Sequence, residues 1–215
     1  SNSPQKRPWW MLSIWFALVS LGFAGLGAYG IQAGETGRVP QTWPVDLARE
    51  PGATALCFVH PKCPCSRATL AELRRLKSSL SDSASLEFVI FQPQDSQTFW
   101  GDEPWKGIYA ASLLEDSDGN RVRLDPGGEL ALKFGALTSG MVLAYGAGGE
   151  LCFQGGITAT RGHEGPSPAQ AWLASALAPG SVPSLQAAPV FGCPIRALDD
   201  RATEGCCDPQ QSKKR

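Results

Sequence analysis

A long run without any charged residue, residues 8–34, constrains this chain more than any other feature. Within it, WWMLSIWFALVSLGFAGLGAYGI supplies about 23 mostly apolar positions, enough to cross a bilayer core of roughly 30 Å as a helix. Lys6 and Arg7 precede the run and Glu35 is the first charge after it, so the basic end should stay in the cytoplasm. The run predicts one transmembrane anchor at residues 8–31, with the remaining chain exported.

A cleaved signal peptide is the alternative interpretation of this run. Ala28-Tyr29-Gly30 would serve as a cleavage site with small residues at its two outer positions. The apolar run is longer than the roughly 7–15 residues usual for the core of a signal peptide, which favours an uncleaved anchor. Both interpretations export the rest of the chain.

Composition limits what the exported part can be. The chain has seven cysteines, and in an oxidising compartment an odd number predicts disulfides plus at least one thiol left over. Its net charge is −1 and it has no basic stripe, so nothing favours a nucleic-acid partner. We expect a cytoplasmic N-terminus at 1–7, a linker at 32–46, one domain at 47–178, and a partly disordered Pro-, Gly- and Cys-containing tail at 179–215.

Short apolar runs alternate with amphipathic segments in the exported part. Residues 54–60 and 85–93 are typical of buried strands, and residues 66–80 between them carry leucines at the three- and four-residue spacing of an amphipathic helix. A strand, helix and strand joined in this way form a right-handed parallel unit. Two further apolar runs, 141–145 and 151–153, are joined by the turn sequence GAGGE and predict a β-hairpin.

The remaining elements complete a recognisable order. Residues 105–113 favour a helix, and residues 121–137 favour a short strand, a turn and one or two helical turns. A helix at 167–178, with Ser167 as its cap and Pro168 at its first position, closes the domain. The order β-α-β and then β-β-α is that of the thioredoxin-like fold, in the α/β class.

The motif Cys63-Pro64-Cys65 stands between the first strand and the first helix of this order, where that fold has its reactive centre. Proline is favoured at the first helical position, which predicts Pro64 there and Cys63 as the N-cap. A thiolate at an N-cap accepts helix N–H groups and feels the positive end of the helix dipole, so its pKa falls below about 8.5. Cys63 is therefore the predicted nucleophile, and Cys65, expected to be more covered, is the predicted resolving thiol.

Other candidate residues have both a functional and a structural interpretation. His60 could stabilise the Cys63 thiolate or bind a metal, or it could be a strand-end histidine bonded to backbone. Arg161 and His163 follow the hairpin, where they could add positive charge or transfer protons beside the reactive cysteine, or merely cap a Gly-rich connection. Cys57 and Cys152 lie inside apolar strand runs and are expected to be small buried residues.

Three cysteines remain in the tail, Cys193, Cys206 and Cys207. They could pair with each other, recruit a metal, or exchange with Cys63. Their spacing does not favour one of these roles over the others.

Four stretches of the chain, FVHPKCPCSRATLAEL, DPGGELALKFGALTSGMVLAYGAGGELCFQGGIT, RGHEG and FGCP, carry a family resemblance. Together they resemble bacterial membrane-anchored thioredoxin-like proteins of the RedB family and, more distantly, the exported thiol-disulfide oxidoreductases of the TlpA and ResA group. The resemblance covers residues 53–194. It implies a thioredoxin-like fold in the cell envelope, that is, a single-pass protein of the bacterial inner membrane with its C-terminal domain on the periplasmic side.

The chain departs from the wider thioredoxin pattern in two ways. The motif is one residue shorter than Cys-x-x-Cys, and a bridge across Cys-x-Cys closes a smaller ring, which should make it easier to reduce. The second departure is the loop before the hairpin, where Thr138-Ser139-Gly140 stands in place of the cis-proline that lines the substrate groove of thioredoxins.

The leading hypothesis is a membrane-tethered, exported thiol-disulfide oxidoreductase. The Cys63 thiolate would attack a protein or small-molecule disulfide, and Cys65 would release the product by forming the Cys63–Cys65 disulfide, with no other cofactor. A membrane electron donor would restore the thiols. The alternative is a copper-binding module or metallochaperone that holds Cu(I) with the same cysteines and His60 or His163, because soft thiolates select that metal. A thiol peroxidase with an oxidisable Cys63 is a third, weaker possibility.

Overall fold

The computed structural model describes residues 9–49, 51–78, 80, 84–92, 121–180 and 184–196. The helix predicted at 105–113, and Cys206 and Cys207, lie outside these residues. The chain forms two compact units, Ser1–Gln32 and Ala33–Arg215, and each is described by itself.

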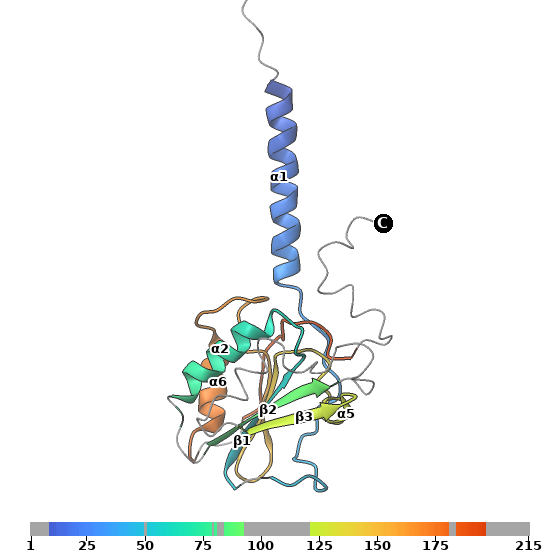
Figure 1. Ribbon diagram of the computed structural model, residues 1–215. Helices are drawn as coiled ribbons and strands as arrows, with labels where there is room; N and C mark the ends of the chain where they lie inside the picture. Colours follow the sequence, from blue (N-terminus) through green and yellow to red (C-terminus); the bar gives the residue numbers. More distant parts are fainter. Residues whose placement is uncertain are drawn as a thin grey trace, which may run out of the picture. The chain divides into compact units, whose positions relative to one another are not determined.

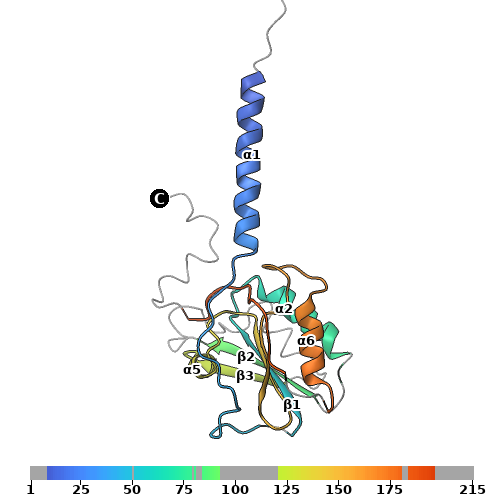
Figure 2. The ribbon, with the colours of Figure 1, turned by 180° about the vertical axis from the view of Figure 1, so that it is seen from behind.

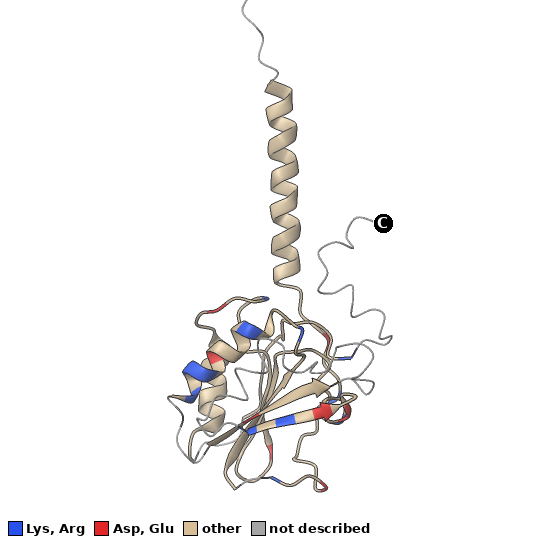
Figure 3. Ribbon diagram, viewed as in Figure 1, with Lys and Arg blue, Asp and Glu red and all other residues tan. Residues whose placement is uncertain are grey.

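The first unit contains one helix, α1 (Trp9–Gly30), of 22 residues. It carries no charged side chain along its whole length (Figure 3), and it has a mean hydropathy of 1.8. At 1.5 Å per residue it is about 33 Å long, which matches the core of a bilayer. The predicted apolar helix is confirmed, and its length and composition are compatible with a single-pass membrane anchor.

The described part of the second unit is built on one six-stranded sheet (Figures 1 and 2). Its order is β3-β2-β1-β4-β5-β6. The strands are β1 (Ala53–Val59), β2 (Ala84–Gln92), β3 (Arg121–Pro126), β4 (Met141–Tyr145), β5 (Leu151–Gly155) and β6 (Gln186–Ala187). β1 pairs in parallel with β2. On its other side, β1 pairs antiparallel with β4, and β4 pairs antiparallel with β5. The predicted parallel unit and hairpin are therefore confirmed.

Helices cover both faces of this sheet. α2 (Ser66–Lys77) and α6 (Pro168–Leu177) lie side by side on one face, and the short α5 (Glu129–Lys133) covers the other (Figures 1 and 2). On the first face Leu73 of α2 and Leu173 of α6 pack with Cys57 of β1. The helix start at Ser167 and Pro168 is as predicted. This order of elements confirms the thioredoxin-like fold.

The segment predicted to be a linker, residues 32–46, instead packs on the domain from residue 34 onward. Val39 is 8% exposed and belongs to the second core, on the α5 side of the sheet. The Trp43 ring meets Phe134 and Tyr145 edge-on, with centroids 5.5 and 5.3 Å away. The linker prediction is wrong because backbone hydrogen bonds and single apolar side chains hold this segment, and neither leaves a periodic pattern.

The predicted domain end at residue 178 is also wrong. Residues 184–196 return to the sheet, where β6 pairs in parallel with β5. Gly155 makes this possible, because a Cβ atom there would lie 2.0 Å from the Ala188 carbonyl oxygen. Val190 and Ile195 are almost completely buried. The tail therefore belongs to the domain at least as far as the described residues reach.

Candidate functional site

The Cys63-Pro64-Cys65 motif lies in a tight turn between β1 and α2. The Ser66 N–H donates to the Cys63 carbonyl at 3.2 Å. The Arg67 N–H donates in the same way to the Pro64 carbonyl, at 3.3 Å. The helix begins at Ser66, with Cys65 as its N-cap. The prediction of Pro64 as first helical residue and Cys63 as N-cap is wrong, because this turn of i→i+3 bonds precedes the regular helix.

The two thiols of the motif differ in exposure. Cys63 is 0% exposed, whereas Cys65 is half-buried. The prediction that Cys65 is the more covered thiol is therefore wrong. The cause is the tail, since the backbone N–H of Cys193 donates to the Cys63 Sγ at 3.4 Å.

Cys193 is held in this place by its neighbours in the chain. The Ser139 N–H donates to the Cys193 carbonyl at 2.8 Å, and Pro194 forms an antiparallel bridge with Thr138. Gly192 approaches so closely that a Cβ atom would lie 1.9 Å from the Ser139 carbonyl oxygen. Of the roles left open for Cys193, exchange with Cys63 would require the contact that this packing provides, and it stays a prediction.

Arg161 also reaches this segment. Its Nη1 donates to the Gly192 carbonyl at 2.6 Å, and its positive charge acts on the Cys65 thiol. Arg161 therefore acts on Cys65, and its predicted role beside the reactive Cys63 stays a prediction. Sequence reasoning had no means of finding that the same side chain holds the tail.

Hydrogen bonds make Cys63 the acidic thiol of the group. The Cys193 thiol, the Cys65 thiol and the Ser66 hydroxyl all bond to the Cys63 sulfur, and together they hold its pKa well below the usual range in spite of burial. The direction agrees with the prediction, but the cause differs. Neighbouring donors act on this sulfur, whereas the predicted helix N-cap does not.

The pKa of Cys65 moves in the opposite direction. The Cys193 thiol lowers it, but the hydrogen bond to Cys63, burial and the negative charge of Cys63 outweigh that effect, and the net result is a raised pKa. The site therefore pairs one thiolate with one thiol. Two groups whose environments separate their pKa values in this way are suited to opposite roles in proton transfer.

Ser139 connects the parts of the site. The His60 N–H donates to the Ser139 Oγ at 2.7 Å, and the Oγ atoms of Ser139 and Ser66 are 2.7 Å apart and share a hydrogen bond. Both serine side chains are buried. Since the Ser139 N–H also bonds Cys193, this one residue ties the end of β1, the start of α2 and the tail together. The sequence marks only the Thr138-Ser139-Gly140 loop as unusual and carries no signal that Ser139 belongs to the site.

His60 is a buried, neutral histidine. Its ring stacks on Phe91, with centroids 5.2 Å apart, and its Nδ1 accepts the Lys62 N–H at 3.2 Å. Burial lowers its pKa to about 4, although the negative charge of Cys63 opposes this shift. His60 thus supplies no positive charge to the Cys63 thiolate at neutral pH. It matches the interpretation of a strand-end histidine bonded to backbone.

The loop that carries Arg161 and His163 is anchored by a buried carboxylate. Glu72 of α2 accepts the Gly165 N–H at 2.8 Å and the Gln170 amide at 3.1 Å. His163 itself is exposed, and its backbone N–H donates to a carbonyl of the same loop. Its proposed part in proton transfer stays a prediction.

Cys57 and Cys152 are core residues, as predicted. Both are at most 2% exposed. Burial raises the pKa of the Cys57 thiol, and burial likewise raises that of Cys152. Neither thiol is suited to nucleophilic attack.

Within the described residues, no group of three or more histidine, cysteine or acidic side chains has a geometry that could hold a metal ion. The Cu(I) alternative, with Cys63 and Cys65 and His60 or His163, therefore stays a prediction. At neutral pH the imidazole of His60 is neutral, as a metal ligand must be, but it lies stacked on Phe91.

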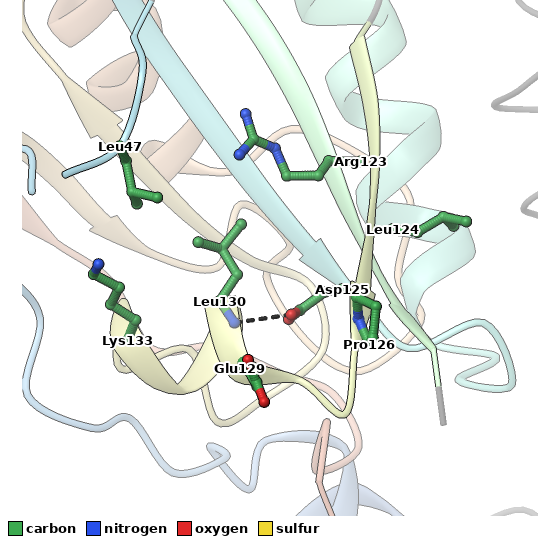
Figure 4. Close-up of a pocket in the computed structure, with 8 residues that line it drawn as sticks. All are labelled: Leu47, Arg123, Leu124, Asp125, Pro126, Glu129, Leu130 and Lys133. Carbon is green, nitrogen blue, oxygen red and sulfur yellow. Dashed lines mark hydrogen bonds between the residues drawn. The ribbon is translucent and has the colours of Figure 1, made fainter. Parts of the chain in front are cut away.

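A pocket of about 390 Å³ lies at the carboxyl end of β3, beside α5 (Figure 4). The Asp125 carboxylate accepts the N–H groups of Leu130 and Ala131 at 2.8 and 2.9 Å, so it serves as the cap of α5. The pocket is lined by Leu47, Arg123, Leu124, Asp125, Pro126, Glu129, Leu130 and Lys133. Since no cysteine lines it, this pocket is separate from the thiol site.

No protein-family model matches the chain, and no curated protein matches its sequence. An uncharacterized conserved protein from Geobacillus kaustophilus is similar in structure, with 14% identity, a TM-score of 0.55, and coverage of 78% of this chain and 93% of that chain. A hypothetical protein from Sinorhizobium meliloti 1021 has 18% identity, a TM-score of 0.50, and coverage of 77% and 94%. A secreted Mycobacterium tuberculosis disulfide oxidoreductase, homologous to E. coli DsbE, has 13% identity, a TM-score of 0.39, and coverage of 59% and 80%.

These similarities concern the fold alone. The first two structures share the architecture of this chain over most of their own length. The third similarity is too low to support an argument about activity. The thioredoxin-like fold is shown by the order of strands and helices in the sheet, and membership of the RedB family stays a prediction.

Proposed function

We propose that this chain is a membrane-tethered, exported thiol-disulfide oxidoreductase that uses Cys63 and Cys65 as its redox pair. The observation that carries the proposal is the pairing of an acidic Cys63 with a neighbouring Cys65 thiol of raised pKa. A thiolate is the nucleophile in disulfide exchange, and a thiol beside it can complete the reaction.

The reaction uses two successive exchanges. The Cys63 thiolate attacks one sulfur of a protein or small-molecule disulfide, the substrate S–S bond breaks, and one substrate sulfur leaves as a thiolate that takes up a proton. Cys65 then loses its proton and attacks the Cys63 sulfur, so that the second substrate sulfur leaves. The product is a Cys63–Cys65 disulfide and a substrate reduced by two electrons. A membrane dithiol donor returns the pair to its reduced form.

Substrate access requires a local movement. Cys63 is fully covered, so a substrate disulfide reaches its sulfur only when the segment around Cys193 shifts away. The bonds of Ser139 and Arg161, the bridge of Pro194 and the bond from the Ile195 N–H to the Leu137 carbonyl hold this segment near Cys63, and they must open locally. Openings of this kind cost less free energy than global unfolding. The half-buried Cys65 marks the exposed edge of the site.

The location follows from the anchor. α1 is long and apolar enough to span a bilayer, and the basic residues before it favour a cytoplasmic N-terminus. The domain would then lie on the periplasmic side, where substrate disulfides persist.

The test uses the full chain in detergent, equilibrated in a series of dithiothreitol redox buffers and then alkylated. We expect a reversible two-electron transition at the motif, together with reduction of a model disulfide such as insulin. Both should be lost in Cys63→Ser and kept in the core control Cys152→Ser.

Tight retention of Cu(I) against a competing chelator without disulfide turnover would contradict the proposal and favour the copper module. Peroxide consumption that survives Cys65→Ser but not Cys63→Ser would favour the peroxidase.

A further inference from the structure

We propose that Cys193 is a third redox thiol of this site, which exchanges with the Cys63–Cys65 disulfide to form a Cys63–Cys193 disulfide. The inference rests on the proposed function and extends it. It assigns a chemical role to a cysteine in a segment that the sequence marks as a polar, Pro- and Gly-rich tail.

The first support is contact. The Cys193 N–H donates to the Cys63 Sγ at 3.4 Å, although 130 positions of chain separate the two residues. The Cys193 thiol also forms hydrogen bonds with the sulfurs of both Cys63 and Cys65. Cys193 is 5% exposed, so this contact is enclosed by protein. A third thiol held next to the Cys63 sulfur is the arrangement that intramolecular exchange requires.

The second support is the way in which the fold holds this thiol in place. The tail lies antiparallel to the loop before β4, through the bridge of Pro194 with Thr138 and the bond from Ser139 to the Cys193 carbonyl. The neighbouring residue can only be glycine, because a Cβ atom at Gly192 would overlap the Ser139 carbonyl. A tail held by strand-like pairing presents its cysteine at a fixed position.

The exchange balances without any added oxidant or reductant. Cys193 gives up its proton and its thiolate attacks the Cys63 sulfur of the Cys63–Cys65 disulfide. The Cys63–Cys193 bond forms as the Cys63–Cys65 bond breaks, and Cys65 leaves as a thiolate that accepts the proton. The site holds one disulfide and one thiol before and after the step. The positive charge of Arg161 acts on Cys65 and so stabilises the leaving thiolate.

Ring size favours this product. The Cys63–Cys65 bridge closes a ring over a single intervening proline, whereas the Cys63–Cys193 bridge joins residues from distant segments that the fold already holds together. Small disulfide rings depart from relaxed geometry and are more easily reduced. Because the fold holds Cys193 next to the Cys63 sulfur, Cys193 can also attack a mixed disulfide between Cys63 and a substrate and release the substrate thiol.

The experiment reads the disulfides directly, in the full chain with Cys206→Ser and Cys207→Ser as background. After oxidation with oxidised glutathione and blocking of free thiols, trypsin cuts after Lys62, Arg67, Arg161 and Arg196. Cys63 and Cys65 then share the peptide 63–67, and Cys193 is the only cysteine of the peptide 162–196. A Cys63–Cys65 bridge stays inside the first peptide, whereas a Cys63–Cys193 bridge links the two in the mass spectrum.

We expect the linked peptides in the background chain and, as the dominant species, in Cys65→Ser. The control Cys152→Ser should leave the pattern unchanged. If Cys65→Ser instead holds glutathione on Cys63 while Cys193 stays free, the inference is overturned and the proposed function stands. If Cys63 of the background chain forms no disulfide at all, the proposed function fails as well, so the two failures are distinguishable.

Turnover gives a second reading that does not depend on trapping a bridge. Cys65→Ser should still release the substrate thiol within about tenfold of the background rate, because Cys193 resolves the mixed disulfide. The double variant Cys65→Ser/Cys193→Ser should accumulate the mixed disulfide at Cys63. Accumulation in Cys65→Ser alone, equal to that in the double variant, would overturn the inference.

Discussion

Cys57 and Cys63 lie on the same stretch of chain, one inside β1 and one just beyond its end, and neither has exposed surface. Burial raises the pKa of the Cys57 thiol, which belongs to the apolar cluster between the sheet and α2. Donors from Cys193, Cys65 and Ser66 lower the pKa of Cys63 in spite of burial. Burial alone therefore does not decide whether a cysteine is reactive, because the number of hydrogen-bond donors around the sulfur has the larger effect.

The largest expected effect separates these two cysteines by activity. Cys63→Ser should lower the rate of disulfide reduction by about 10³-fold, since no other side chain replaces the attacking thiolate. Cys57→Ala should leave the rate unchanged. Turnover of a model disulfide by the full chain measures both. Equal losses in the two variants would mean that the distinction between them is wrong.

A titration of His60 tests the effect of burial at a second group of the site, where burial is the largest cause of the pKa shift. The folded pKa is about 4 and the ordinary value is 6.5, so below pH 6.5 the unfolded chain binds a proton that the folded chain refuses. Stability should therefore fall by roughly 3 kcal/mol from this group as the pH drops from about 6.5 to about 4, and no further below that. His60→Asn should flatten that part of the urea-unfolding profile.

The exposed His163 offers a matched control for this titration. His163→Asn should keep the acid loss of stability seen in the wild-type chain. The charges nearest to His60, on Cys63 and Lys62, are present in both variants. If the free energy of unfolding of His60→Asn falls with pH as steeply as that of the wild-type chain, the buried imidazole does not cause the acid loss of stability.

Gly192→Ala tests whether the tail segment is what buries Cys63. The added methyl group would overlap the Ser139 carbonyl, so the tail should dock less tightly. Alkylation of Cys63 by iodoacetamide should accelerate about tenfold, because local opening becomes more frequent. Gly180→Ala serves as the control, since φ there is +70° but no atom lies within 4 Å of the new Cβ. An equal acceleration in both variants would argue against the tail as the cover.

The smallest effect removes a single donor. Ser66→Ala should raise the pKa of Cys63 toward that of an ordinary thiol and cost about 1 kcal/mol of stability, because a buried hydrogen-bond partner is lost. The absorbance of the thiolate near 240 nm against pH measures the shift. Ser78→Ala, at the exposed end of the same helix, should change neither quantity. A thiolate titration identical to that of wild type would remove Ser66 from the set of donors.

Much of the fold could be predicted from the sequence, because its core elements have strong local patterns. The leucines of α2 repeat at helical spacing, β4 is a continuous apolar run, and Ser167-Pro168 marks the start of α6. The predicted hairpin has a Gly-rich turn whose Gly149 has φ +93°. Each of these signals is contained in a few neighbouring residues.

The errors share one physical cause. The tail around β6 and the segment around Val39 are held by backbone hydrogen bonds, close contacts at glycine and isolated apolar side chains. Such contacts join residues far apart in the chain and leave no periodic pattern. For the same reason, the spacing of Cys63 and Cys65 identifies them in the sequence, whereas their contact with Cys193 leaves no signal there. The tail covers Cys63, so Cys63 is less exposed than Cys65, the reverse of the prediction.

The dependence of Cys63 on the Cys193 thiol also sets the moment at which the site matures. The largest contribution to the acidity of Cys63 comes from a residue made 130 positions later in the chain. During synthesis and export the motif is complete long before Cys193 emerges, and until the tail docks its first thiol lacks that donor. Native contacts of such long range form late in folding. The chain therefore passes through its most exposed stage without the donor that contributes most to the lowered pKa of Cys63.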